Sequence, residues 1–116
     1  MATGSTPKPS ELIRLGAAKF PNAGVTYSGL AEFTGYGSYR KIARISALGA
    51  LYAGAGYDLD HFDQAAANAV LFDGWRAWVS GLHRELPIVD AIADLMSAER
   101  WTPEDVARYL EINLGL

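Results

Sequence analysis

Cysteine is absent from this sequence of 116 residues. Its absence excludes disulfide bonds, thiolate zinc sites and cysteine nucleophiles, so the fold does not depend on the redox state of its compartment. The sequence also lacks an apolar run of the roughly 20 residues that cross a bilayer, and its N-terminus lacks the apolar segment of a secretory signal. Together these absences predict a cytoplasmic protein with no membrane partner.

Residue types that carry catalysis or bind metals are also sparse. The sequence has two histidines, and no serine, histidine and acid stand in a pattern typical of nucleophilic catalysis. One cluster holds side chains of the metal-ligand or acid-base type, namely Asp58, Asp60, His61 and Asp63. Helix capping accounts for Asp60 and Asp63, which stand three residues apart at an expected helix start. We therefore expect no catalytic residue, metal or cofactor; the sequence favours a non-catalytic protein and leaves an enzyme open.

Hydrophobic residues make up 50% of the chain, which at this length is enough for one core in a single domain. Apolar residues recur three or four apart through most of it, whereas the alternation found in strands is almost absent. Residues 1–9 hold prolines and small polar residues and are expected to form a disordered leader. The expected fold is therefore all-α, with five to six helices in a compact domain over residues 10–116.

One expected helix, over about residues 38–54, lies at the centre of this fold. No charged residue occurs from Ile45 to Tyr57. Small residues recur three or four apart along one side of the helix, where other backbones can approach closely, and they are Ala43, Ala47, Ala50 and Gly54. Bulky apolar residues occupy most of the remaining surface, and a helix that is apolar nearly all round is buried.

Charge is distributed unevenly along the chain. Residues 1–44 carry six basic and two acidic side chains, whereas residues 45–116 carry four basic and eleven acidic ones. Two interpretations are open. The two parts complement each other within one fold or between the subunits of a homo-oligomer, or the basic part faces a polyanion.

Residues 27–46 resemble the helix-turn-helix of bacterial regulators. In that motif an alanine of the first helix packs under the second, and a glycine four residues later makes the turn, as Ala31 and Gly35 would here. The resemblance implies that the second helix presents polar and basic side chains to the major groove of duplex DNA or to its phosphates. Those candidate nucleic-acid or phosphate-binding residues are Ser38, Tyr39, Arg40, Lys41 and Arg44.

The loop Gly35–Ser38 has a second interpretation. It would precede the start of the central helix, and backbone amides at a helix start attract anions. With Arg40 and Lys41 one turn further on, the loop would form a small site for a phosphate or a nucleotide.

Three tryptophans are the candidate interface residues, Trp75, Trp78 and Trp101. Each is expected in the core by default, because a tryptophan brings a large apolar surface. An exposed one would instead mark the surface that holds a partner protein.

The segment from Ser46 to Leu51, Ser-Ala-Leu-Gly-Ala-Leu, and the helix start Thr102-Pro-Glu-Asp-Val resemble a family of small uncharacterised helical proteins. Members of that family occur in actinobacteria and their phages, and they have a cysteine at the position of Ser46. The family has no established activity, so the resemblance implies a helical fold and a host range and leaves the function open.

These patterns favour a binding protein. We expect a non-catalytic accessory or inhibitory factor of bacterial or phage origin that binds another protein through the surface of a helical scaffold. The alternative is a small helix-turn-helix regulator that binds duplex DNA through Ser38 to Arg44.

Overall fold

The computed structural model describes residues 7–71, 76–79 and 84–116. Its elements in chain order are α1 (Pro9–Ala18), β1 (Gly24–Val25), β2 (Ala31–Thr34), the 3-10 helix η1 (Gly37–Tyr39), β3 (Lys41–Ile45), α2 (Ala47–Gly54), α3 (Gln64–Leu71), β4 (Arg76–Val79), β5 (Arg84–Pro87), α4 (Ile88–Ala98) and α5 (Pro103–Leu114). The fold is α/β, because a three-stranded mixed sheet and a two-stranded sheet accompany the five described helices. The prediction of an all-α fold is therefore wrong.

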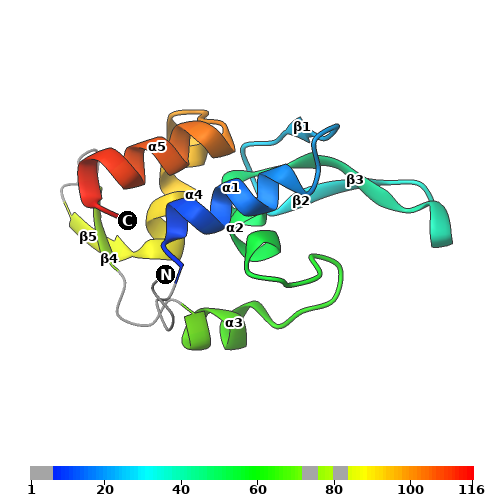
Figure 1. Cartoon of the computed structure of the whole chain (residues 1–116), viewed down its shortest axis with the longest axis horizontal. Coiled ribbons are helices and arrows are strands. Elements are labelled where there is room, and N and C mark those ends of the chain that lie inside the picture. Colours follow the sequence, from blue (N-terminus) through cyan, green and yellow to red (C-terminus); the bar gives the residue numbers. More distant parts are fainter. Residues whose placement is uncertain (1–6, 72–75, 80–83) are drawn as a thin grey trace, which may run out of the picture.

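The helices form a body, and β2 and β3 extend away from it as a long hairpin (Figure 1). Within the body α2 is the central element, and every residue from Ala47 to Ala53 is buried. The prediction of a buried central helix is thus confirmed for Ala47–Gly54. It is wrong for residues 38–46, which form η1, β3 and the residue before α2.

Ser46 explains where the central helix begins. Its backbone is extended, and its Oγ accepts a hydrogen bond from Gly49 N at 3.0 Å, which makes Ser46 the N-cap. The five residues before it include Ile42 and Ile45, whose β-branched side chains suit a strand. The sequence therefore changes from strand to helix at Ser46.

The close approach of α1 and α2 depends on glycine. A Cβ on Gly16 would lie 1.8 Å from Ala50 O, and a Cβ on Gly54 would lie 1.8 Å from Leu12 O. The two backbones therefore touch where both side chains are missing. Ala50 and Gly54 belong to the stripe of small residues that the sequence predicts to be a contact surface, and this part of the prediction is confirmed.

The three-stranded sheet has the order β1-β3-β2. β1 runs parallel to β3 and pairs with it only at Arg44 and Ile45. β2 runs antiparallel to β3, and the register shifts where Glu32 pairs with Arg44 and Phe33 pairs with Ile42. Ala43 is the additional residue on β3, which is the arrangement of a β-bulge.

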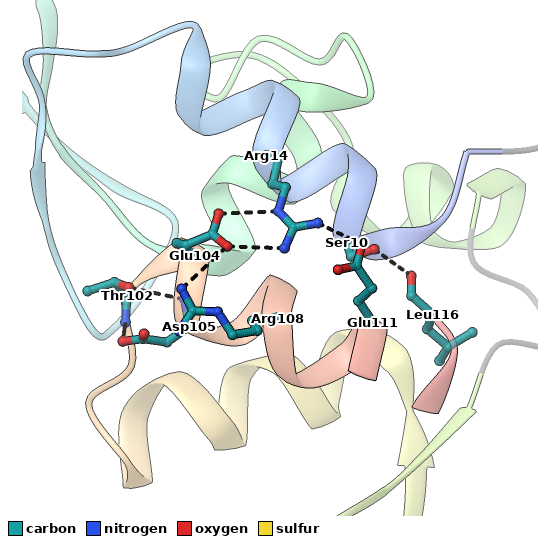
Figure 2. A network of polar contacts seen from close by, with 8 residues as sticks. All are labelled: Ser10, Arg14, Thr102, Glu104, Asp105, Arg108, Glu111 and Leu116. Carbon is teal, nitrogen blue, oxygen red and sulfur yellow. Dashed lines mark hydrogen bonds and ion pairs between the residues drawn. The ribbon is translucent and has the colours of Figure 1, made fainter. Parts of the chain in front are cut away.

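Polar contacts lie at both ends of α5. The helix start that the sequence indicates at Thr102 is confirmed, since Thr102 and Asp105 form a capping box at the start of α5. At the other end of α5, Leu116 O accepts hydrogen bonds from Ser10 N and Ser10 Oγ, both at 3.0 Å (Figure 2). Pro9 is the first residue of α1 and is buried, so the packed body begins at the last residue of the predicted leader, one residue before the predicted start of the domain.

None of the helices in the described part of the chain combines the length and apolar character needed to cross a membrane.

Candidate functional site: the hairpin arm and its cleft

Residues 31–45, which comprise β2, η1 and β3, form the part of the protein that projects farthest from the helical body (Figure 1). We call this segment the arm. Two tyrosines lie at its tip, and they are the most exposed large hydrophobic residues of the described chain. Tyr36 is 91% exposed and Tyr39 is 84% exposed. An amphipathic ring held this far in solvent contributes nothing to the core, so its presence at the tip needs another explanation.

The backbone of the tip is well defined by its own contacts. Tyr39 N donates to Tyr36 O at 3.0 Å, and Arg40 N donates to Gly37 O at 3.1 Å. Gly35 has a φ of +85°, and a Cβ there would lie 2.3 Å from Tyr39 O, so only glycine fits. The two tyrosines are therefore presented on a closed turn.

Arg40 joins the arm to the body. Its guanidinium carbon lies 4.5 Å from the centre of the Phe33 ring, and its Nη2 lies 2.9 Å from Asp60 Oδ1. Phe33 belongs to the arm, whereas Asp60 belongs to the loop between α2 and α3. Because both charged side chains are partly exposed, the ion pair contributes on the order of 0–1 kcal/mol. We therefore expect it to affect the position of the arm more than the stability of the fold.

A cleft of about 670 Å³ separates the base of the arm from the body. Three runs of consecutive residues form most of its walls, and two residues of β2 complete it. They are residues 19–23, residues 40–43, residues 57–60, Phe33 and Thr34. The cleft therefore combines the segment after α1, the start of β3 and the loop after α2.

The charges in the cleft are largely matched. Lys19 Nζ donates to Ala53 O at 2.7 Å near the end of α2, and Arg40 pairs with Asp60. Lys41 also lines the cleft and is exposed, and it forms no ion pair with any residue the structure describes. Lys41 is thus the cation in this cleft that is available to an incoming acidic group.

The candidate nucleic-acid residues all lie on the arm. Ser38 and Tyr39 are in η1, Arg40 follows it, and Lys41 and Arg44 are in β3. The structure thus groups them, but on a hairpin and not on a recognition helix. The helix-turn-helix predicted over residues 27–46 is not formed, because β2 and β3 replace both expected helices.

The anion site predicted at Gly35–Ser38 also loses its structural basis. It requires the N-terminus of a long helix, and the residues that follow form only the three-residue η1 and then a strand. The backbone amides of Tyr39 and Arg40 already donate within the turn.

The cluster around His61 has structural contacts for each of its carboxylates. Asp63 Oδ1 accepts from Ala66 N at 3.1 Å and so caps α3. The capping role predicted for Asp60 is wrong, because α3 begins only at Gln64. Asp58 Oδ1 accepts from Asp60 N at 3.0 Å, and Asp60 holds Arg40. No group of three or more potential metal ligands occurs among the residues that the structure describes.

The tryptophans divide into two cases. Trp75, and the side chain of Trp78 in β4, lie outside the described residues. Trp101 is partly buried, with its ring centre 5.3 Å from that of Tyr109 on α5. These two rings line a hollow of about 360 Å³ beside Ile112, which is 70% exposed. This hollow is smaller than the cleft of the arm, and the polar residues Asp105, Arg108 and Asn113 complete its lining.

Sequence reasoning missed the hairpin and therefore the cleft. Its signals were the two glycines of the tip, Gly35 and Gly37, between short segments with β-branched and aromatic residues. It also missed Tyr36, Phe33 and the role of Asp60, because that role depends on a contact between segments about twenty residues apart.

A scan against protein-family models, a search of curated proteins and a search of solved structures found no match to this chain, so the candidate site is supported by its geometry.

Proposed function

We propose that this protein is a non-catalytic accessory or inhibitory factor that binds another protein through the tip of the arm. The observation that carries the proposal is the pair of tyrosines, Tyr36 and Tyr39, which are 91% and 84% exposed on a closed turn.

Tyrosine and arginine are enriched at the centres of protein interfaces, because they bury a large area and can still form hydrogen bonds. A turn whose backbone is already ordered loses little conformational entropy on binding. A projecting loop with these properties suits a concave partner surface, as long binding loops do in small antibody domains. Insertion into such a concavity would block or stabilise the partner, which is what an inhibitory or accessory factor does.

Duplex DNA is the weaker candidate partner. A two-stranded ribbon fits the major groove, but DNA affinity depends on several phosphate contacts. Of the arm's cations, Arg40 pairs with Asp60 and Arg44 lies 3.9 Å from Glu32. Lys41 is the arm's one cation without an ion pair to a residue that the structure describes. The whole chain has a net charge of −3.

The proposal extends to the setting of the interaction. The resemblance of the Ser46–Leu51 segment to actinobacterial and phage proteins supports a bacterial or phage partner in the cytoplasm. A homo-oligomer is a further form of the same proposal, in which the partner is a second copy.

Site-specific photo-crosslinking tests the proposal. The full chain, with a benzophenone amino acid in place of Tyr39, is irradiated in lysate of the cells that produce it. We expect one dominant protein adduct, and we expect Tyr36→Ser in the same chain to reduce its yield. The control carries the benzophenone at Ile112, which is exposed on α5 and is not part of the arm.

Equal adducts from both positions, or none from the tip, would contradict the proposal. Crosslinks to duplex DNA that weaken steeply with salt would support the DNA alternative instead.

A further inference from the structure

We infer that the cleft holds an extended segment of a partner protein, which pairs with the free edge of β3 and places one acidic side chain against Lys41. This inference rests on the proposed function, since both place a protein partner against the arm. It concerns different residues, so the two can fail separately.

Within the described residues, one edge of β3 is partly free. β1 lies on one side of β3 and β2 on the other, and β1 pairs only with Arg44 and Ile45. On the β1 side, residues 41–43 pair with no strand in the described parts of the chain, and they line the cleft. An unpaired strand edge presents N–H and C=O groups at the spacing of another strand, and extended peptides bind by adding to such an edge.

The free edge of β3 is short. Ala43 is the bulged residue of β3, and β1 occupies the edge beyond it. At the other end, Arg40 follows the turn of the tip. The available edge is thus residues 41–43, and the paired part of the partner is correspondingly short. Side-chain contacts must therefore supply part of the affinity.

Part of the cleft wall is apolar. Phe20, Tyr57 and Leu59 are partly buried hydrophobic residues that pack against the core, and they line the cleft together with Phe33. The volume of about 670 Å³ lies within the range of roughly 300–1,000 Å³ that is typical of ligand sites. A strand places alternate side chains on opposite faces, so alternate residues of the partner segment can enter the cleft.

The described charged side chains of the cleft leave one cation available to a partner. Lys41 is exposed without an ion pair in the described chain, whereas Lys19 and Arg40 are already engaged. Asp58 and Asp60 lie in the same cleft and repel a second acid. The cleft therefore selects one acidic side chain among apolar ones, and it disfavours a polyanion such as a nucleic acid.

Peptide selection tests this inference and does not require the partner to be identified first. A random linear peptide library displayed on phage is panned against the full chain. We expect enriched sequences with one Asp or Glu beside apolar residues. A fluorescent synthetic copy of the most enriched peptide then gives the Kd by anisotropy. Lys41→Glu should weaken its binding by about tenfold or more, because the contact becomes repulsive.

Backbone pairing is tested on the same peptide. In a paired strand, alternate amides face the neighbouring strand and the others face away. N-methylation of one alternate set should abolish binding, and N-methylation of the other set should leave it intact. Arg108→Glu is the matched charge reversal on an exposed residue of α5. It should leave the Kd unchanged. Lys41→Gln serves as the second variant if Lys41→Glu does not fold.

Several results would overturn the inference. One is a library that yields no enriched peptide, or only enriched peptides without an acidic residue. Another is a peptide that binds Lys41→Glu as tightly as wild type. A third is a peptide that still binds after N-methylation of either alternate set of amides. The double variant Tyr36→Ser/Tyr39→Ser should bind the peptide as wild type does. If the peptide binds but the tip forms no crosslink, only the proposed role of the tip is contradicted. If the tip forms the crosslink but no peptide binds, only the cleft site is contradicted.

Discussion

Gly16 of α1 and Gly54 of α2 face each other so closely that a Cβ on Gly54 would lie 2.9 Å from Gly16 N and 1.8 Å from Leu12 O. The obstacle is backbone on both sides, and backbone cannot rotate away as a flexible side chain can. The contact between the two helices therefore has no room for any other residue at either position.

The first prediction is that Gly54→Ala destabilises the domain although alanine is the better helix former. Relief of the overlap requires α1 and α2 to separate, which we expect to cost about 1–3 kcal/mol or more of unfolding free energy. Urea denaturation followed by circular dichroism measures this cost. Gly24→Ala is the control, because the nearest atom to a Cβ there would be Arg44 Cγ at 3.4 Å, and the backbone oxygen Ala43 O would lie at an ordinary contact distance of 3.7 Å. Equal stability of the two variants would show that the helices are not in contact at Gly54.

The second prediction concerns Ser46, which is fully buried. Its hydroxyl lies 2.8 Å from Gly29 O and 3.0 Å from Leu30 O, and it also accepts from Gly49 N. Ser46→Ala removes the N-cap of α2 and leaves the amide of Gly49 without this acceptor. We expect a loss of about 1–2 kcal/mol of unfolding free energy in chemical denaturation.

Ser46→Cys extends the test to the family that the sequence resembles, whose members have cysteine there. A thiol is a weaker donor and acceptor, so its stability should lie between those of wild type and Ser46→Ala. Ser97→Ala on α4 is the control, since the Ser97 hydroxyl is exposed and its hydrogen bonds to described residues stay within its own helix. A cysteine variant less stable than the alanine variant would argue against the resemblance at this position.

The third prediction is that the stability of the fold depends on pH through the ion pairs between α1 and α5. Arg14 donates two hydrogen bonds to Glu104, at 3.2 and 3.1 Å, and a third to Glu111 at 2.8 Å (Figure 2). The hydrogen bonds from Arg14 lower the pKa of the Glu104 carboxyl. A carboxyl whose folded pKa is lowered stabilises the fold above its unfolded pKa of about 4.3, and this contribution is lost as pH falls through the folded value.

Glu104→Gln should therefore be less stable than wild type at pH 7, and the difference should shrink as the pH is lowered below 4. Thermal unfolding across this pH range measures it. The effect is small, because all three side chains are partly exposed. Glu99→Gln is the control, since Glu99 is exposed and pairs with no cation among the described residues. A difference that stays constant with pH would show that the ion pair is not formed.

The buried helix was predictable, and the sheet was not, for a physical reason. The absence of charge from Ala47 to Gly54 is a local signal, and burial follows from it directly. The pairings of β3 join Arg44 to Gly24 and Lys41 to Thr34, and nothing in a strand of two to five residues indicates its partner. Charged residues in β3 therefore resembled the first turn of a helix.

The candidate site was half predictable for a similar reason. Tyr39, Arg40 and Lys41 stand out in the sequence because basic and aromatic residues adjoin a glycine-rich loop. The cleft does not, because it requires Lys19 and Asp60 to meet the arm from elements on either side of it. Residue chemistry was visible in the sequence, whereas the shape that gives it a use was not.

The last prediction concerns the contact between Arg40 and Asp60, which joins the arm to the body at 2.9 Å. Asp60→Asn should leave the unfolding free energy within about 1 kcal/mol of wild type, because the pair is partly exposed. It should nevertheless speed hydrogen exchange at residues 40–43, since local opening of the arm no longer has to break the pair. Hydrogen exchange followed by mass spectrometry measures residues 40–43 and α2 in the same sample, and α2 serves as the internal reference. Arg44→Gln is the matched control, because Arg44 lies 3.9 Å from Glu32 within the arm itself. Faster exchange in α2 as well would mean that the pair supports the whole fold and not the position of the arm.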